Sequence, residues 1–345
     1  MNMKLKFLLL SVMLGSGYLG AANASYIEVD QGTVAVANRA SGSVSIIDVQ
    51  TDNVVNMLIL PAAAQIPEPM YVVYKENRLY VGDRANNRIV VYDSFGFNLL
   101  KIIPTGSGVF HMWAAKEAQV LLVNNDIDKT VTVIDTNSLS AINTLSLPSD
   151  LLAEGFKPHD VFITNKGKNA FVSLVDGQDG NDYIVKLSIK RNKELSRKEV
   201  GGDPHLFISP LKRNTLYVPS QDSGEVLALN TRNLATRYQF DVPNAHGIYA
   251  LGRRLYVTNI AEGGAHGLYT LDAKGKHIID TDNTPYGAPH NITVTANGQK
   301  IYVTHSGATQ DKVSVYQTIP GRQLPSYLGE ITVQNNPFGL AYIPH

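Results

Sequence analysis

Five of the nine histidines in this 345-residue chain stand at the start of short apolar runs. Three follow a proline, in KPHDVFI (157–163), GDPHLFI (202–208) and GAPHNIT (287–293). A neutral imidazole offers a nitrogen lone pair that binds copper, zinc, nickel or iron. A fold that brings these histidines together would therefore make a transition-metal site. The five are His111, His159, His205, His246 and His290.

The elements that must position them form an internal repeat. Similar β-rich phrases recur as RLYVGD (78–83), NAFVSL (169–174), TLYVPS (215–220), RLYVTN (254–259) and KIYVTH (300–305). Each phrase follows a short apolar strand and a turn, and each precedes a polar loop and an alternating strand. Helical periodicity is absent over any useful length, so the pattern predicts an all-β fold.

The spacing of the repeat predicts a seven-bladed β-propeller with four-stranded blades. Aligning the strands that precede these phrases gives seven anchors 41 to 48 residues apart, which is the length of one blade. After the N-terminal leader only three strands precede the first complete blade, and PFGLAYI (337–343) is a lone strand at the other end. We expect this C-terminal strand to join the N-terminal blade, because closure removes two free sheet edges. Residues 25–345 are then one domain. The anchors are Met70, His111, His159, His205, His246, His290 and Phe338.

The phrase Tyr256-Val257-Thr258-Asn259 and its variants resemble the repeat of the bacterial YVTN β-propeller family. This resemblance extends over essentially the whole mature chain. It implies a seven-bladed propeller. It leaves the activity open, because such propellers serve as enzymes, binders and scaffolds.

In a propeller the first strand of each blade lines the central channel, so the seven anchors should form a ring at its mouth. Desolvation and mutual repulsion should keep the five imidazoles neutral near pH 7. No carboxylate stands at an anchor, which argues against Ca²⁺ or Mg²⁺. Met70 adds a thioether for Cu(I), so copper is favoured, with zinc, nickel or iron as alternatives. The competing interpretation is that duplication carried a structural histidine along.

Loops that should open on the same mouth carry further candidates. His305 directly follows its strand in YVTHSG, and Glu262 and His266 lie in the glycine-rich stretch AEGGAHG. Each could be an additional ligand, an acid or base, or a hydrogen-bond partner of a ligand.

The histidine ring also resembles the copper-cluster propeller domain of nitrous oxide reductase. That resemblance implies copper ligands at His111, His159, His205, His246 and His290. Met70 and Phe338 depart from it, no cupredoxin domain follows, and the chain has no cysteine for an electron-transfer copper site. A complete nitrous oxide reductase is therefore excluded, and a smaller cluster or a single ion remains open.

The N-terminal segment has the features of a secretory signal. Lys4 and Lys6 precede the apolar stretch 7–19, and Ala22-Asn23-Ala24 is a small-x-small cleavage site. We expect residues 1–24 to be removed and the mature protein to be periplasmic or secreted, with no membrane span. Without Lys4 and Lys6 the chain has 28 basic and 30 acidic residues, a net charge of −2, which argues against nucleic acid as a partner.

These observations favour an exported metal-binding propeller that admits a small molecule at the channel mouth. A metal-dependent oxidoreductase served by a periplasmic electron-transfer partner is an extension of this interpretation. Two alternatives stay open. One is an interaction scaffold. The other is a non-redox enzyme of the lyase or lactonase type. The chain resembles streptogramin lyases and some lactonases, which are propellers of similar size that place a histidine and acidic residues at the mouth. Glu262 with His266 or His246 would then be its acid and base.

Overall fold

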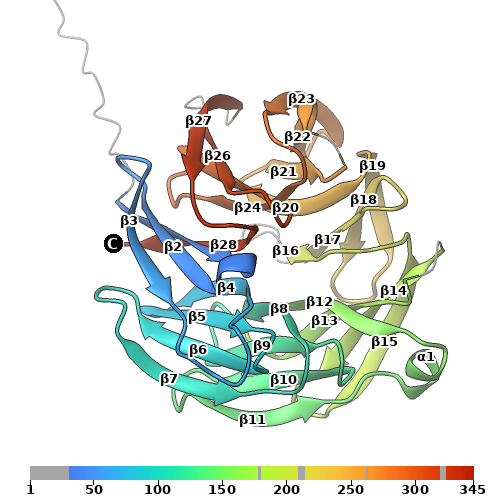
Figure 1. Ribbon diagram of the computed structural model, residues 1–345. Helices are drawn as coiled ribbons and strands as arrows, with labels where there is room; N and C mark the ends of the chain where they lie inside the picture. The colour runs from blue at the N-terminus through green and yellow to red at the C-terminus, as the bar shows by residue number, and fades with distance from the viewer. Residues whose placement is uncertain (1–30, 178–179, 209–213, 262, 319–323) are drawn as a thin grey trace, which may run out of the picture.

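The computed structural model describes residues 31–177, 180–208, 214–261, 263–318 and 324–345. The predicted signal segment, residues 1–24, lies outside these ranges. Seven four-stranded antiparallel sheets surround a central axis, as the repeat predicted (Figure 1). Within the described residues, no helix is long and apolar enough to cross a membrane.

Each sheet contributes one strand to the channel and one to the outside. The inner strands are β4 (Pro69–Lys75), β8 (Val109–Ala114), β12 (Lys157–Ile163), β16 (Phe207–Ile208), β20 (Ala245–Leu251), β24 (Pro289–Val294) and β28 (Pro337–Pro344). The second strands are β5 (Arg78–Asp83), β9 (Val120–Asn125), β13 (Asn169–Val175), β17 (Thr215–Ser220), β21 (Arg254–Asn259), β25 (Lys300–His305) and β1 (Gly32–Asn38).

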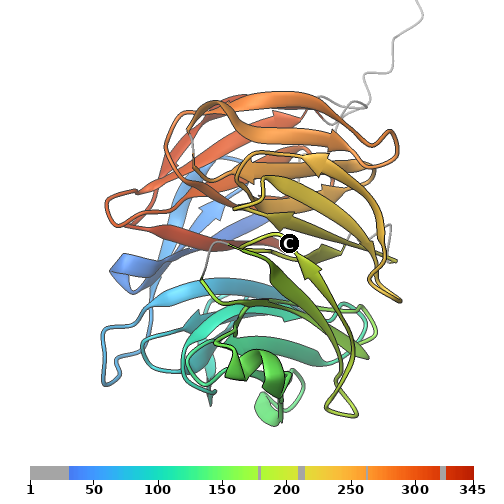
Figure 2. The ribbon, with the colours of Figure 1, turned by 90° about the vertical axis from the view of Figure 1, so that its right-hand side faces the viewer.

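The outer half of each sheet completes the blade. The third strands are β6 (Arg88–Asp93), β10 (Thr130–Asp135), β14 (Asp182–Ser188), β18 (Glu225–Asn230), β22 (Gly264–Asp272), β26 (Lys312–Thr318) and β2 (Ser43–Asp48). The outer strands are β7 (Leu99–Pro104), β11 (Ser140–Leu145), β15 (Lys193–Val200), β19 (Thr236–Asp241), β23 (His277–Thr284), β27 (Pro325–Thr332) and β3 (Asn53–Ile59). A short 3₁₀ helix, η1 (Arg39–Ser41), follows β1, and the short helix α1 (Ser149–Ala153) lies on the periphery (Figure 2).

The circle is closed by the two ends of the described chain. Strand β28 pairs with β1 in antiparallel register, with Gly32 opposite Pro344 and Val34 opposite Tyr342. The sheet order β28-β1-β2-β3 confirms the predicted closure of the N-terminal blade by the C-terminal strand. Each of these two strands thereby covers the edge that the other would expose.

The repeated phrases build the core between blades. Tyr80, Tyr217, Tyr256 and Tyr302 occupy equivalent positions in second strands and are fully buried. Tyr256 packs with Ile292 of the next blade, and Tyr302 packs with residues of β1 and β2 in the closing blade. The tyrosine of the repeat is therefore a packing residue, which explains its recurrence without reference to function.

One carboxyl group in the outer part of a blade should make stability depend on pH. Burial, with a smaller effect of the like-charged Asp280, raises the pKa of Asp282 to about 6, and its Oδ2 has no partner among the described residues. A raised carboxyl pKa means that the stabilising contribution is present below about pH 4 and is lost as the pH rises through about 6.

We therefore expect Asp282→Asn to stabilise the protein at pH 8 by about 1 kcal/mol after discounting for solvent screening. This corresponds to a rise in melting temperature of about 1–2 °C for a domain of this size. At pH 4 the carboxyl group is largely protonated in the folded protein, so the variant and the parent should melt together there. Thermal denaturation at both pH values measures this, and an equal shift at both would contradict the explanation.

Candidate functional site

The five predicted histidines converge at the centre of the propeller. Neighbouring ring centroids are 5.2 Å apart for His111 and His159, 4.8 Å for His159 and His205, 3.9 Å for His205 and His246, and 4.5 Å for His246 and His290. All are buried except His159, whose side chain is 18% exposed. We call these five residues the histidine cluster.

A β-bulge positions them. In six of the seven sheets the pairing between the inner strand and its neighbour shifts by one residue near the start of the inner strand. Two consecutive residues of the inner strand then lie opposite one residue of the neighbouring strand. Such a bulge changes the direction in which the side chains point. The first bulge residues are Met70, Phe110, His159, His246, His290 and Phe338, and the second are Tyr71, His111, Asp160, Gly247, Asn291 and Gly339.

This register corrects the expectation that all five histidines occupy one equivalent position. Phe110, not His111, is equivalent to His159, and His111 is one residue further along its strand. His111 still reaches the cluster, because its bulge directs both residues toward the axis. Its nearest equivalents are Tyr71 and Asp160, and it contacts both.

The two other predicted ring members behave differently. The ring of Phe338 packs against His290, with centroids 4.1 Å apart. Met70 is fully buried and does not line the central cavity. The next residue, Tyr71, reaches the cluster instead, and its hydroxyl lies 2.9 Å from Nε2 of His111.

Two aspartates enter the site, although the anchors alone predicted none. Asp160 is buried, with Oδ1 3.0 Å from Nδ1 of His111 and Oδ2 3.7 Å from Nδ1 of His205. Asp160 also accepts a 2.8 Å hydrogen bond from the backbone N–H of Leu206. Asp203 Oδ1 lies 3.2 Å from Nε2 of His159. The signal was in the sequence, because Asp160 directly follows His159.

Several ring nitrogens of the cluster have no hydrogen-bond partner among the described residues. Within the described residues, Nε2 of His159, of His205 and of His246 is buried and makes no hydrogen bond, and the nearby Asp203 oxygen is within ion-pair distance only. Nδ1 of His246 lies 3.0 Å from Oε1 of Gln221. That contact makes Nδ1 the donor, which leaves Nε2 as a free lone pair.

Two groups of side chains at the cluster have ligand atoms spaced closely enough to hold a metal ion. One ligand atom each from His111, His159 and His205 lie within 4.8 Å of one another, and the same holds for Asp203, His205 and His246. The two groups share His205. Imidazole nitrogens with a supporting carboxylate are a donor set for zinc, copper, iron or nickel.

The protonation of the cluster follows from its burial. Desolvation lowers the pKa of His111, His246 and His290, and it lowers the pKa of His159 to about 3. The positive charge of neighbouring imidazoles adds to this effect.

His205 and Asp160 are the exceptions. Burial opposes the charge on each of them, but their mutual attraction outweighs it. The pKa of His205 is raised by Asp160 and Asp203, and the pKa of Asp160 is held well below its usual range by His111 and His205. Four of the five imidazoles are therefore neutral at pH 7, and Asp160 is ionised.

His305 and His266 make their side-chain contacts outside the cluster. His305 is fully buried, with Nδ1 3.1 Å from the carbonyl oxygen of Gly287 and Nε2 2.8 Å from Oγ of Ser314. Both of its nitrogens are thus engaged elsewhere. His266 is exposed, with Nδ1 3.3 Å from Oγ1 of Thr281. Glu262 lies outside the described residues.

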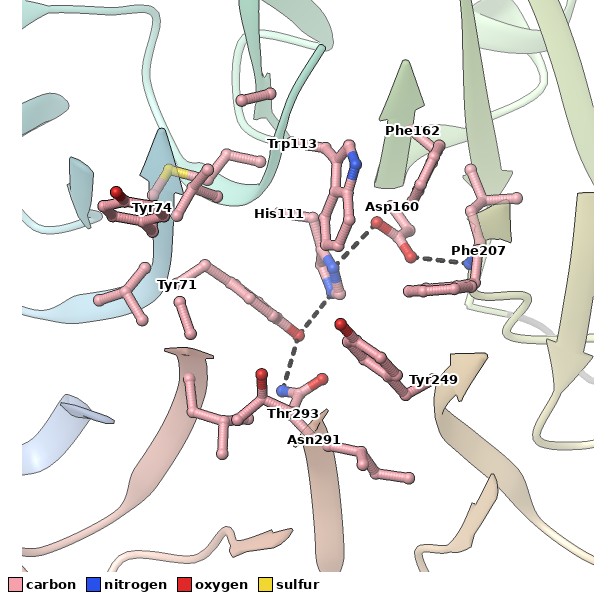
Figure 3. A pocket seen from close by; sticks show the side chains of 18 of the residues that line it. Tyr71, Tyr74, His111, Trp113, Asp160, Phe162, Phe207, Tyr249, Asn291 and Thr293 are labelled. Atoms are coloured by element: carbon pink, nitrogen blue, oxygen red, sulfur yellow. Dashed lines mark hydrogen bonds and ion pairs between the residues drawn. The ribbon is translucent and has the colours of Figure 1, made fainter. Parts of the chain in front are cut away.

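A cavity of about 480 Å³ lies along the inner strands beside the cluster, and Figure 3 shows side chains that line it. His111, His205 and His246 form part of its lining, together with Asp160 and Asn291. On the other side, near the predicted mouth, the rings of Phe110 and Phe338 crowd the cluster, with Arg84 over Phe110 and Arg39 over Phe338. The space for a ligand therefore lies in the channel along the inner strands and not at the mouth where these strands begin.

The cluster depends on a close approach of two inner strands. Gly247 follows His246, and a Cβ at this position would collide with the carbonyl oxygen of His290. We expect Gly247→Ala to destabilise the protein by about 2 kcal/mol or more and to displace His290. Gly287→Ala is the matched control, since a Cβ there meets nothing within 4 Å. Equal melting temperatures for the two variants would contradict this account.

Comparisons with known proteins establish the fold and not the chemistry. No protein-family model and no curated protein matches this chain. The periplasmic gluconolactonase of Pseudomonas aeruginosa is a similar solved structure, with a TM-score of 0.69, 16% identity, and coverage of 90% of this chain and 99% of that one. A protein of Bacteroides uniformis described as a "putative 6-phosphogluconolactonase" has a TM-score of 0.67 and 16% identity, covering 91% and 100%. Hydrazine synthase of Kuenenia stuttgartiensis has a TM-score of 0.61 and 14% identity, covering 88% and 99%.

Proposed function

We propose that this protein binds a transition-metal ion through the histidine cluster and admits a small molecule to it through the central cavity. The observation that carries the proposal is the set of three buried Nε2 atoms, on His159, His205 and His246, that have no hydrogen-bond partner in the described chain. A buried polar atom without a partner costs about 1–3 kcal/mol. A metal ion at either group of closely spaced ligand atoms would give a partner to two of these histidines, His159 with His205 or His205 with His246.

The surrounding residues support such a role. In one arrangement His111, His159 and His205 would be the ligands, with His111 releasing its bond to the hydroxyl of Tyr71. In the other arrangement the ligands would be Asp203, His205 and His246. Asp160 and Gln221 would hold His111 and His246 in the required orientation through Nδ1. Copper is the favoured ion, because Cu²⁺ binds imidazole sites most tightly among the divalent first-row ions, with zinc, nickel and iron as alternatives. We include in this proposal that the repeat resembles that of YVTN propellers and that the histidine ring resembles the copper-cluster domain of nitrous oxide reductase.

Metal analysis tests the proposal directly. The mature protein, purified from its native compartment and separately reconstituted with Cu(I), Cu(II) and Zn(II), should retain about one equivalent of metal or more after gel filtration. The His266→Ala variant is the control, because His266 is exposed and outside the cluster. Less than about a tenth of an equivalent under every condition would overturn the proposal.

Lactone hydrolysis is the second candidate function. His111 lies between the hydroxyl of Tyr71 and the carboxylate of Asp160 and lines the cavity, and a neutral imidazole oriented by a carboxylate can act as a general base. The gluconolactonase names of two structural neighbours favour this candidate. Hydrolysis of gluconolactone that survives exhaustive chelation and is lost in His111→Gln would support it over the metal site.

We also propose that the protein is exported and acts in the periplasm or outside the cell, with a periplasmic electron-transfer partner if the metal is redox-active. The predicted signal at 1–24 and the periplasmic location in the name of one structural neighbour support export. N-terminal sequencing of the protein from its native host should find a mature chain beginning near Ser25. A chain that retains Met1 would contradict export by this route.

A further inference from the structure

One wall of the central cavity is a continuous set of aromatic rings. Trp113, Phe162, Phe207 and Tyr249 come from the four consecutive inner strands β8, β12, β16 and β20. Ring centroids are 4.6 Å apart for Trp113 and Phe162, which stack, 5.7 Å for Phe162 and Phe207, and 5.2 Å for Phe207 and Tyr249. A wall of this kind offers flat apolar surface to a ligand.

The rest of the cavity supplies a few polar groups. The hydroxyl of Tyr71 lies 3.3 Å from Nδ2 of Asn291, and both residues point toward the cavity with Thr293 (Figure 3). Tyr249 also lines the cavity, and its hydroxyl makes no hydrogen bond to any described residue. The phenol points inward, toward the histidine cluster. The Tyr249 hydroxyl and the Nε2 atoms of His205 and His246, which have no hydrogen-bond partner among the described residues, can therefore form hydrogen bonds with a ligand at the cluster end of the cavity.

Charge is confined to the two ends of the cavity. Asp160 lies at the cluster end, and Lys75, Glu76 and Lys116 lie where the inner strands finish. Lys75 is paired with Glu76 at 3.0 Å. Among the described residues, none that lines the middle of the cavity is an arginine or lysine, which proteins normally use, with helix N-termini, to bind phosphate. The lining therefore suits an uncharged ligand.

We propose that the cavity binds an uncharged planar aromatic molecule bearing a phenolic hydroxyl or a carbonyl, with its ring against the aromatic wall and its polar end at the histidine cluster. This deepens the proposed function by naming the ligand class that the metal site would receive. Binding itself rests on the aromatic wall and on Tyr249, so it does not require the metal.

The protein contains a convenient reporter, because Trp113 is its single tryptophan and lines the cavity. We would titrate metal-free and metal-loaded protein with 4-hydroxyacetophenone, following tryptophan fluorescence and heat. We expect saturable binding with a Kd of about 0.1–1 mM for a ligand of this size. Cyclohexanol and 6-phosphogluconate should bind at least about tenfold more weakly.

Two variants test where in the cavity the ligand binds. Tyr249→Phe should weaken binding about three- to tenfold by removing the free hydroxyl. The matched control is Tyr238→Phe, whose hydroxyl contacts Tyr217 outside the cavity lining, and it should bind as the parent does. Thr293→Phe should fill the cavity and block binding while metal content is retained.

The outcomes separate this inference from the proposed function. If the reconstituted protein retains no metal but still binds the aromatic ligand saturably, the inference is supported and the lack of metal retention rejects the metal site. Metal retention without saturable aromatic binding, in either metal-free or loaded protein, overturns the inference alone. Tighter binding of 6-phosphogluconate than of 4-hydroxyacetophenone also overturns it, and so does an equal effect of Tyr249→Phe and Tyr238→Phe. If Thr293→Phe does not fold, the ligand series and the tyrosine pair still decide.

Discussion

Replacing His205 and His246 together with alanine should abolish transition-metal binding, with affinity for Cu(II) or Zn(II) falling at least about 1,000-fold. These two rings lie closest in the cluster, with centroids 3.9 Å apart, and both carry a buried Nε2 without a hydrogen-bond partner. His205 also belongs to both groups of atoms whose spacing suits a metal ion. The double variant therefore removes the residues on which either arrangement of ligands depends.

Competition with a chelator of known affinity, together with metal analysis, measures this loss. His266→Ala is the control for removing an imidazole, and circular dichroism verifies that the double variant retains its β-structure. A cavity left by two buried side chains lowers stability, so His205→Gln with His246→Gln provides a polar pair closer in volume. Metal content equal to that of the parent in both folded pairs would show that the cluster is not the site.

The repeat made the architecture predictable. Four strands in each period of 41 to 48 residues, with three strands at one end and one at the other, have a natural closure as seven blades. The convergence of the histidines follows from that closure, since the start of every inner strand meets at one axis. These are consequences of periodicity and edge pairing, both of which can be read from sequence.

The sequence did not predict in the same way which residue of each inner strand points into the central channel. A bulge adds one residue locally without changing the apolar pattern on either side, so alignment by pattern cannot tell Phe110 from His111. The same bulges bring Tyr71 and Asp160 to the cluster. Sequence reasoning that considers one anchor per blade therefore misses the residues that orient the histidines, although each stands beside an anchor.

The cavity was missed for a different reason. Trp113, Phe162, Phe207 and Tyr249 lie in apolar inner strands, where an aromatic residue usually means a packed core. Only the curvature of the ring of blades leaves space between them. The ligand space consequently lies along the inner strands, whereas the sequence pointed to the mouth where those strands begin.

Asp160→Asn should separate the orienting role of this carboxylate from its contribution to stability. In the parent, Nδ1–H of His111 donates to Oδ1 of Asp160, which leaves Nε2 to accept from Tyr71 or to bind a metal. An asparagine that turns its amide N–H toward Nδ1 would favour the other tautomer and place the proton on Nε2. His111 would then be unable to act as a ligand, and we expect metal affinity to fall about 10- to 100-fold.

Asp160→Ala should instead destabilise the fold itself. It leaves the backbone N–H of Leu206 without its acceptor and removes the negative charge beside His205, which should lower the free energy of unfolding by about 2–4 kcal/mol. Asp280→Asn, on outer strand β23, is the control for losing a carboxylate far from the cluster. The Cu(II) electron paramagnetic resonance spectrum would record the loss of a nitrogen ligand in Asp160→Asn. An unchanged spectrum and affinity with only a lower melting temperature would mean that Asp160 supports the fold and does not position His111.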